Sequence, residues 1–172
     1  MTSTGDPDAV QQAAAQVEEL LQAELEGAFK RVGEVTFVAK RGSAVVAIRV
    51  EEGEGEPLIH VEANVVEGAT LDAEILRQLL EFNHGSAFGA FGVDEDGTIT
   101  VHHCLLVSAL SAATLVPAVK EVARIADDWD DVLVEQAGGK TAVERLTERL
   151  QPRAQPTIVP ARGAADSPPP KE

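Results

Sequence analysis

The sequence has few aromatic residues and almost no cysteine. Its 172 residues include five Phe, one Trp and no Tyr, so a buried core has to be built mainly from Val, Leu, Ile and Ala. Stacking platforms for bases or sugars are not expected in such a chain. The single cysteine, Cys104, excludes an internal disulfide and a metal site made of several thiolates. It also fits a reducing compartment, so we expect a cytoplasmic protein.

Basic residues and long apolar runs are also scarce. The chain has 14 Lys and Arg against 29 Asp and Glu, a formal net charge of -15. Residues 1–9 contribute -2 and residues 151–172 contribute +1, so residues 10–150 carry -14. This charge repels nucleic acid and anionic membranes, and neither is an expected partner. No apolar run approaches the ~20 residues that span a bilayer, and residues 1–8 lack an export-signal pattern, which predicts a soluble, unexported protein.

The middle of the chain has the composition of a folded domain. Hydrophobic residues make up 44% of the chain and charged residues 25%, close to globular averages. Six of the nine prolines lie in residues 151–172, and neither end shows an apolar period. The sequence therefore predicts a flexible N-terminus at 1–9, one domain at 10–150 and a disordered proline-rich tail at 151–172.

Apolar residues that recur every three or four positions predict four helices. Thr70 is the expected N-cap of the second helix, and Thr114 is preferred to Ser111 as the cap of the third because Pro117 then falls in the first turn. Thr141 and Glu144 have the capping-box spacing of an appended short helix. The predicted helices span about 9–31, about 71–83, from Ser111 or Thr114 to Gly138-Gly139, and 141–150.

Alternating apolar residues predict five strands. Strands at 35–39 and 44–50 flank a turn at 40–43, and a third strand carries its apolar residues on one face over 59–65. Strands at 87–93 and 98–107 flank the turn Asp94-Glu95-Asp96-Gly97. The predicted fold class is therefore α+β: helix, three-stranded antiparallel meander, helix, two-stranded hairpin, long helix.

The strands of the meander are apolar on both predicted faces. We expect Val46, Ile48, Ile59 and Val61 to lie opposite Val35, Phe37 and Val45, so that the helices cannot cover both sets. A partner chain or bound peptide would cover the rest.

An aspartate cluster offers an enzymatic alternative. Residues Asp127-Asp128-Trp129-Asp130-Asp131 have the DDxxD spacing with which one helical turn can hold magnesium and a diphosphate. Trp129 falls in the apolar stripe, however, which favours a solvated acidic face with the tryptophan in the core. A magnesium-dependent enzyme using Asp127–Asp131 is kept as an alternative.

Other motifs point to no cofactor and no metal site. Gly138-Gly139-Lys140-Thr141 lacks the upstream glycine and the preceding strand of a phosphate-binding loop. His102 and His103 point to opposite faces of a strand and cannot share one ion. No serine lies in a nucleophile elbow, and Cys104 is expected to be a small buried apolar residue.

Several segments together resemble a known family. They are Leu79–Asn83, Phe88-Gly89-Ala90-Phe91, the Asp/Gly turn that follows, the strand containing His103-Cys104-Leu105, Ala126-Asp127 and Gly138-Gly139. Over residues 10–139 the chain is similar to YbjN-type domains, which belong with the CesT-like bacterial type III secretion chaperones. The order of the predicted elements agrees with the chaperone fold.

The resemblance implies a non-enzymatic module that binds extended segments of a client protein or peptide, often as an acidic homodimer. It implies no catalytic residues and no cofactor. The candidate peptide-binding residues are Asn83, Phe88, Phe91 and His103. The acidic body favours basic, apolar peptides as ligands. A structural subunit of a larger assembly is a third interpretation.

Overall fold

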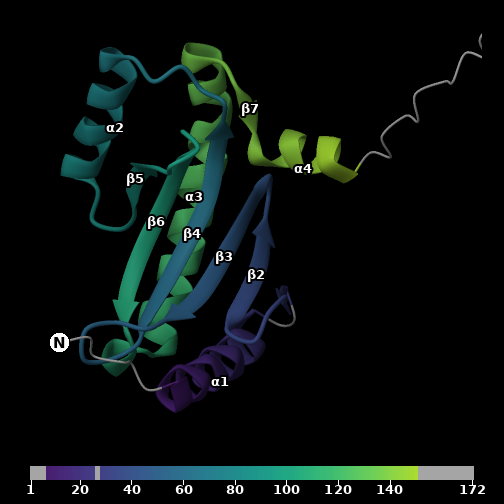
Figure 1. Ribbon diagram of the computed structural model, residues 1–172, viewed down its shortest axis with the longest axis vertical. Helices are drawn as coiled ribbons and strands as arrows, with labels where there is room; N and C mark the ends of the chain where they lie inside the picture. The colour runs from purple at the N-terminus through teal and green to yellow at the C-terminus, as the bar shows by residue number, and fades with distance from the viewer. Residues whose placement is uncertain (1–6, 26–27, 151–172) are drawn as a thin grey trace, which may run out of the picture.

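The computed structural model describes residues 7–25 and 28–150, and within them it shows an antiparallel sheet with helices packed around it (Figure 1). The predicted α+β class and the predicted element order are confirmed, with additions at β1 and β7. The elements are α1 (Pro7–Glu24), β1 (Phe29–Arg31), β2 (Thr36–Arg41), β3 (Ala44–Glu51), β4 (Leu58–Glu67), α2 (Ala73–Gly85), β5 (Ala90–Val93), β6 (Ile99–Leu106), a 3-10 turn (Val107–Ala109), α3 (Ala112–Ala137), β7 (Lys140–Thr141) and α4 (Ala142–Leu150). Residues 1–6 of the predicted flexible N-terminus and all of the predicted tail, 151–172, lie outside the described residues. Flexibility predicted for residues 7–9 is wrong, because these residues form the start of α1.

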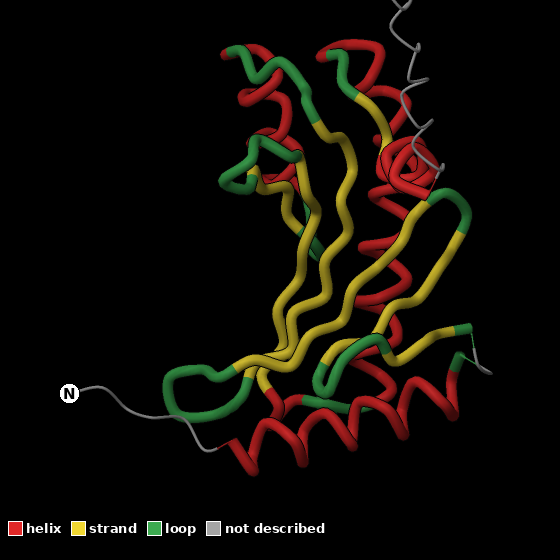
Figure 2. The backbone as a smooth tube through the Cα atoms, turned by 45° about the vertical axis from the view of Figure 1, so that its right-hand side comes forward, coloured by secondary structure: helices red, strands yellow, loops and turns green. Residues whose placement is uncertain are grey.

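The strands run in the order β1-β2-β3-β4-β6-β5, and β7 pairs with β4. Helix α3 packs along one face of the sheet, and α1 crosses one end of that face (Figure 2). Alternate residues of β3 are buried beneath these helices, and the others are partly exposed on the opposite face. The core therefore has one main layer, between the sheet and α1 and α3.

The predicted division of the meander into two apolar faces is wrong. Phe37 pairs with Ile48, and Ile48 pairs with Val61, so all three side chains lie on the helix-covered face. The tight turn at Gly42-Ser43 sets this register, and Val45 consequently pairs with Lys40 on the other face. The opposite face, which α1 and α3 do not cover and against which α4 packs at β3 and β4, is a mixture of polar and small apolar residues in which Arg49 forms ion pairs with Glu51 and Glu62.

The first helix is shorter at its C-terminal end than its apolar period predicts. It ends at Glu24, and Phe29–Arg31 forms the edge strand β1 instead of a last helical turn. The ring of Phe29 packs edge-on against Phe37, with centroids 6.2 Å apart. Cross-strand pairing with β2 thus overrides the helical period in this segment. The helix also begins at Pro7, two residues before the predicted start.

Two predicted helix caps are wrong by a few residues. Asp72 caps α2 by accepting hydrogen bonds from the amides of Glu74 and Ile75, whereas the amide of Thr70 donates to the Ala137 carbonyl. Ser111 caps α3, with Thr114 as its capping-box partner at the third helical position. Pro117 therefore lies inside α3, beyond the first turn.

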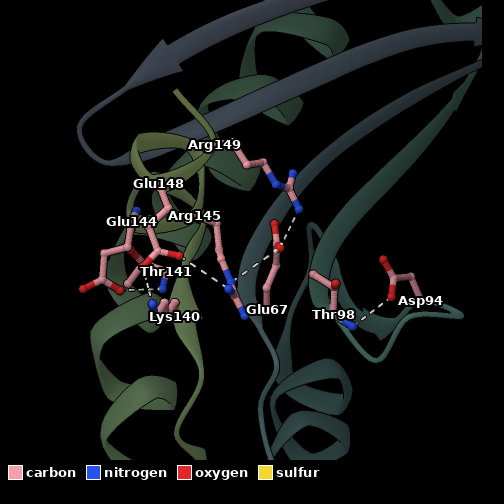
Figure 3. A network of polar contacts seen from close by, with 9 residues as sticks. All are labelled: Glu67, Asp94, Thr98, Lys140, Thr141, Glu144, Arg145, Glu148 and Arg149. Atoms are coloured by element: carbon pink, nitrogen blue, oxygen red, sulfur yellow. Dashed lines mark hydrogen bonds and ion pairs between the residues drawn. The ribbon is translucent and has the colours of Figure 1, made fainter. Parts of the chain in front are cut away.

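The appended helix α4 is fastened to β4 by charge (Figure 3). The predicted capping box is confirmed, because the Thr141 amide donates to Glu144 and the Glu144 amide donates to the Thr141 hydroxyl. Glu67 forms ion pairs with Arg149 at 2.9 Å and with Arg145 at 3.8 Å. Gly139 has φ +86°, and a Cβ there would lie 2.7 Å from the Glu67 carbonyl oxygen, so the close approach of β7 to β4 requires glycine.

Candidate functional site

The aspartate cluster on α3 fastens the β2–β3 turn. Asp127 accepts hydrogen bonds from the Ser43 amide at 2.8 Å and from the Ser43 hydroxyl, and Asp130 accepts from the same hydroxyl at 3.0 Å. These bonds lower the pKa of Asp127, whereas burial raises the pKa of Asp130. Asp128 pairs with Arg124 at 2.5 Å through its Oδ2 atom.

Only part of this cluster is the solvated face that the sequence predicts. Asp130 is 9% exposed, because α3 turns it towards the β2–β3 turn rather than towards solvent. Among residues 7–25 and 28–150, no group of three or more His, Cys, Asp or Glu side chains could hold a metal ion. The contacts of Asp127 and Asp130 therefore give the cluster a structural role.

Two of the predicted peptide-binding residues, Asn83 and Phe91, are hydrogen-bonded to each other. The Asn83 side chain on α2 donates to the Phe91 carbonyl at 3.0 Å and accepts from the Phe91 amide at 2.7 Å. Phe91 is 6% exposed, and its ring packs edge-on against Phe82 and Trp129. Asn83 therefore imitates a neighbouring strand along the outer edge of β5.

The other two predicted peptide-binding residues, Phe88 and His103, are in contact with each other. The rings of Phe88 and His103 are 5.3 Å apart, and His103 Nδ1 accepts from the Gly89 amide at 3.4 Å. Burial lowers the pKa of His103, with a smaller contribution from His102. Phe88 is 43% exposed. Of the four residues, Phe88 is thus the one with a largely accessible side chain, and contact with a peptide stays a prediction for all four.

An apolar surface that the sequence reasoning missed lies on the outer side of α2. Leu76 and Leu80 are 41% and 68% exposed and line an open hollow of about 590 Å³ together with Ala73, Arg77, Glu81 and His84. Leu76 and Leu80 are four residues apart, so they form a second apolar stripe beside the buried stripe of Ile75 and Leu79. That spacing was the available signal. We call this the α2 surface.

A second missed feature is a groove of about 320 Å³ between the end of α1, the end of β2 and the middle of α3. We call it the α1–α3 groove. No single motif marks it, because three distant segments and several small side chains form it. Its lining residues are Leu25, Ala28, Ala39, Lys40, Arg41, Val46, Val119, Lys120 and Ala123.

The groove lies beside the β1–β2 edge of the sheet. At the opposite edge, Asn83 occupies the outward backbone groups of Phe91 in β5. Among the described residues, β1 pairs with β2 only as far as Ala39, and β2 continues to Arg41 beyond it. The last two residues of β2 are therefore not paired with β1.

Comparisons with known proteins agree with this fold. A chain of the ExsC-ExsE complex is 22% identical, with a TM-score of 0.55 over 70% of this chain and 95% of that chain. A chain of the HopA1-SchA chaperone-effector complex is 13% identical, with a TM-score of 0.55 over 70% and 97%. A chain of the ExoU-SpcU complex from the type III secretion system of Pseudomonas aeruginosa is 13% identical, with a TM-score of 0.53 over 70% and 99%. These matches show that the fold is shared.

The sequence comparison identifies the family. No curated protein matches the chain. The family model described as T3SS (YopN, CesT) and YbjN peptide-binding chaperone 1 matches residues 11–145, which include every described strand and all described helices except the start of α1 and the second half of α4. No helix among the described residues has the length and apolar character needed to cross a membrane. The chain belongs to the T3SS (YopN, CesT) and YbjN peptide-binding chaperone family.

Proposed function

We propose that this chaperone binds an extended apolar segment of a client protein in the α1–α3 groove, without enzymatic activity and in the cytoplasm. The observation that carries this proposal is the position of the groove beside the end of β2 that extends past β1. Backbone pairing with β2 would hold the segment, and the groove would take its apolar side chains. One solved structure with this fold is described as a chaperone-effector complex. This description supports the proposal that the client is a protein.

The four residues predicted from the sequence divide between two roles in this proposal. Phe88, beside His103, offers an apolar contact to the client away from the groove. Asn83 and Phe91 hold β5 against α2 and so fix the surface on which Phe88 lies.

Filling the groove is expected to weaken binding of an apolar peptide at least tenfold. Ala28 is exposed and lines the groove, so Ala28→Trp would occupy the space without overpacking the core. Ala23→Trp is the matched control, because Ala23 is exposed on α1 but does not line the groove. Fluorescence anisotropy with a labelled peptide of alternating Leu and Gln measures the affinity. Equal binding by the two variants would place the peptide elsewhere.

We also propose that the chaperone is a homodimer that packs through the α2 surface. Arg77 and Glu81 flank the exposed Leu80 on one helix. If two copies of α2 pack antiparallel about a two-fold axis near residue 79, each Arg77 faces Glu81 of the other copy. The two Leu80 side chains then meet near the axis. An apolar centre with reciprocal charge pairs is self-complementary.

Leu80→Asp is expected to convert the dimer to a monomer. A charge at the centre of an apolar interface is buried without a partner, whereas in the monomer Leu80 is exposed and the change costs little. Val32→Asp is the control, because Val32 is also an exposed apolar residue but lies after β1, away from α2. Light scattering gives the mass of each variant. A wild-type monomer at micromolar concentration, or a dimeric Leu80→Asp variant, would contradict this interface.

A further inference from the structure

We propose that the α1–α3 groove selects client segments in which apolar residues are flanked by acidic ones, although the protein as a whole is strongly acidic. This inference rests on the proposed function and names the ligand chemistry of the same groove. It departs from the expectation of basic ligands that the net charge gives.

Two cationic side chains border the groove. Among the described residues that line it, Arg41 and Lys120 are cationic and none is acidic, whereas the side chain of Lys40 lies with Val45 on the opposite face of the sheet. Arg41 Nη1 donates to the Lys120 carbonyl oxygen at 3.1 Å, and this bond holds the guanidinium of Arg41 close to the helical turn of α3 that carries Lys120. Two of the 14 basic residues of the chain thus lie at the rim of one small apolar groove.

The acidic groups nearest this cluster on α3 are already engaged. Glu121 is bound to Arg124 at 2.6 Å, and Asp127 accepts from Ser43. Within the part of the chain that the structure describes, neither Lys40 nor Lys120 forms an ion pair with a carboxylate. After Arg124 and Ser43, Arg41 also helps to lower the pKa of Glu121 and of Asp127, whereas Lys120 has no ion-pair partner among the described residues, so a carboxylate on a bound ligand would gain most beside Lys120.

The body charge and the groove charge act over different distances. The -14 of residues 10–150 influences approach over roughly one Debye length, about 8 Å at physiological salt. The side chains at the rim act at contact distance, where a pair is screened less. Net charge thus sets the rate of encounter, and the local cations decide which bound segment is held longest.

The walls and the neighbouring strand favour a peptide over another apolar anion. Leu25, Val46 and Val119 supply aliphatic surface, which suits aliphatic side chains. A fatty acid would also match an apolar groove with a cationic rim. The end of β2 beside the groove additionally offers backbone groups, which a peptide can pair with and a fatty acid cannot.

Three peptides with the same apolar residues and with Glu, Gln or Lys flanks test the proposal on the full chain. The wild type should bind the Glu-flanked peptide about fivefold more tightly than the Lys-flanked one, as expected of a few exposed charge pairs. Lys120→Glu should reverse this order. Lys30→Glu changes the net charge equally but should preserve the order, because Lys30 pairs with Val38 and lies on the face of the sheet opposite the groove.

Each other outcome overturns the proposal in a recognisable way. Preference of the wild type for Lys flanks, or equal effects of Lys120→Glu and Lys30→Glu, would show that net charge governs the choice. Binding of all three peptides with one affinity, still blocked by Ala28→Trp, would refute the acidic preference and leave the proposed function intact. Failure of all three to bind would refute both. Displacement of the Glu-flanked peptide by octanoate at lower concentration than by free peptide would identify a fatty-acid site instead.

Discussion

Trp129→Ala should lower the free energy of unfolding by about 3 kcal/mol, because truncating a large aromatic side chain removes its packing and leaves a cavity. Trp129 joins three elements: its ring on α3 packs edge-on against Phe82 of α2 at 5.2 Å and Phe91 of β5 at 5.5 Å. Edge-to-face pairs of this kind add to the burial of apolar area. The side chain is only partly buried, which places the expected cost at the lower end of the usual range.

Urea unfolding followed by circular dichroism measures this cost. Circular dichroism is needed because Trp129 is the only tryptophan and its fluorescence disappears in the variant. Val32→Ala serves as the control, since Val32 is an exposed apolar residue outside the core and should change stability by less than about 0.5 kcal/mol. A loss below about 1 kcal/mol in Trp129→Ala would mean that the aromatic cluster does not fasten α2 to α3.

The strand alternation predicted much of this fold, because one helix-covered face imposes a period of two on β3 and β4. The pattern did not reveal which apolar set faces the helices. That depends on the register across Gly42-Ser43, where a shift of one residue would exchange the faces. Similarly, the apolar period of α1 continues to Ala28, but strand pairing takes over at Phe29. The spacing of apolar residues therefore predicted which helices and strands form, whereas strand pairing in the folded structure determined where they begin and end.

The candidate site was harder to predict than the fold. Ala28, Ala39 and Ala123 carry no chemical signal in the sequence, and they form a groove only because their small side chains leave space where three segments meet. The aspartate cluster carried a strong apparent signal, yet its partner Ser43 lies 84 residues from Asp127 and could not be inferred from spacing. Asn83 was singled out through the family resemblance alone. The structure shows that its side chain bonds the backbone of Phe91 and so joins α2 to β5.

Asn83→Leu should cost about 2–3 kcal/mol, since it removes two hydrogen bonds and leaves the amide and carbonyl of Phe91 without these partners in a partly buried position. Leucine has the same number and branching of side-chain heavy atoms as asparagine, so the change chiefly removes the hydrogen bonds. Thermal or urea unfolding measures the loss. Asn64→Leu is the matched control, because Asn64 is exposed on the face of β4 opposite α3 and should tolerate the same substitution.

The same variant tests why the two sheet edges differ. With Asn83 in place, the outward backbone groups of Phe91 in β5 are occupied, which discourages another strand from pairing there. Without it, β5 becomes an open edge, and we expect Asn83→Leu to form larger assemblies in light scattering while peptide binding in the α1–α3 groove persists. The opposite result, full stability with loss of peptide binding, would show that Asn83 contacts the client directly. In that case the client would lie along β5 rather than β2, and the location of the site would have to move to the other edge of the sheet.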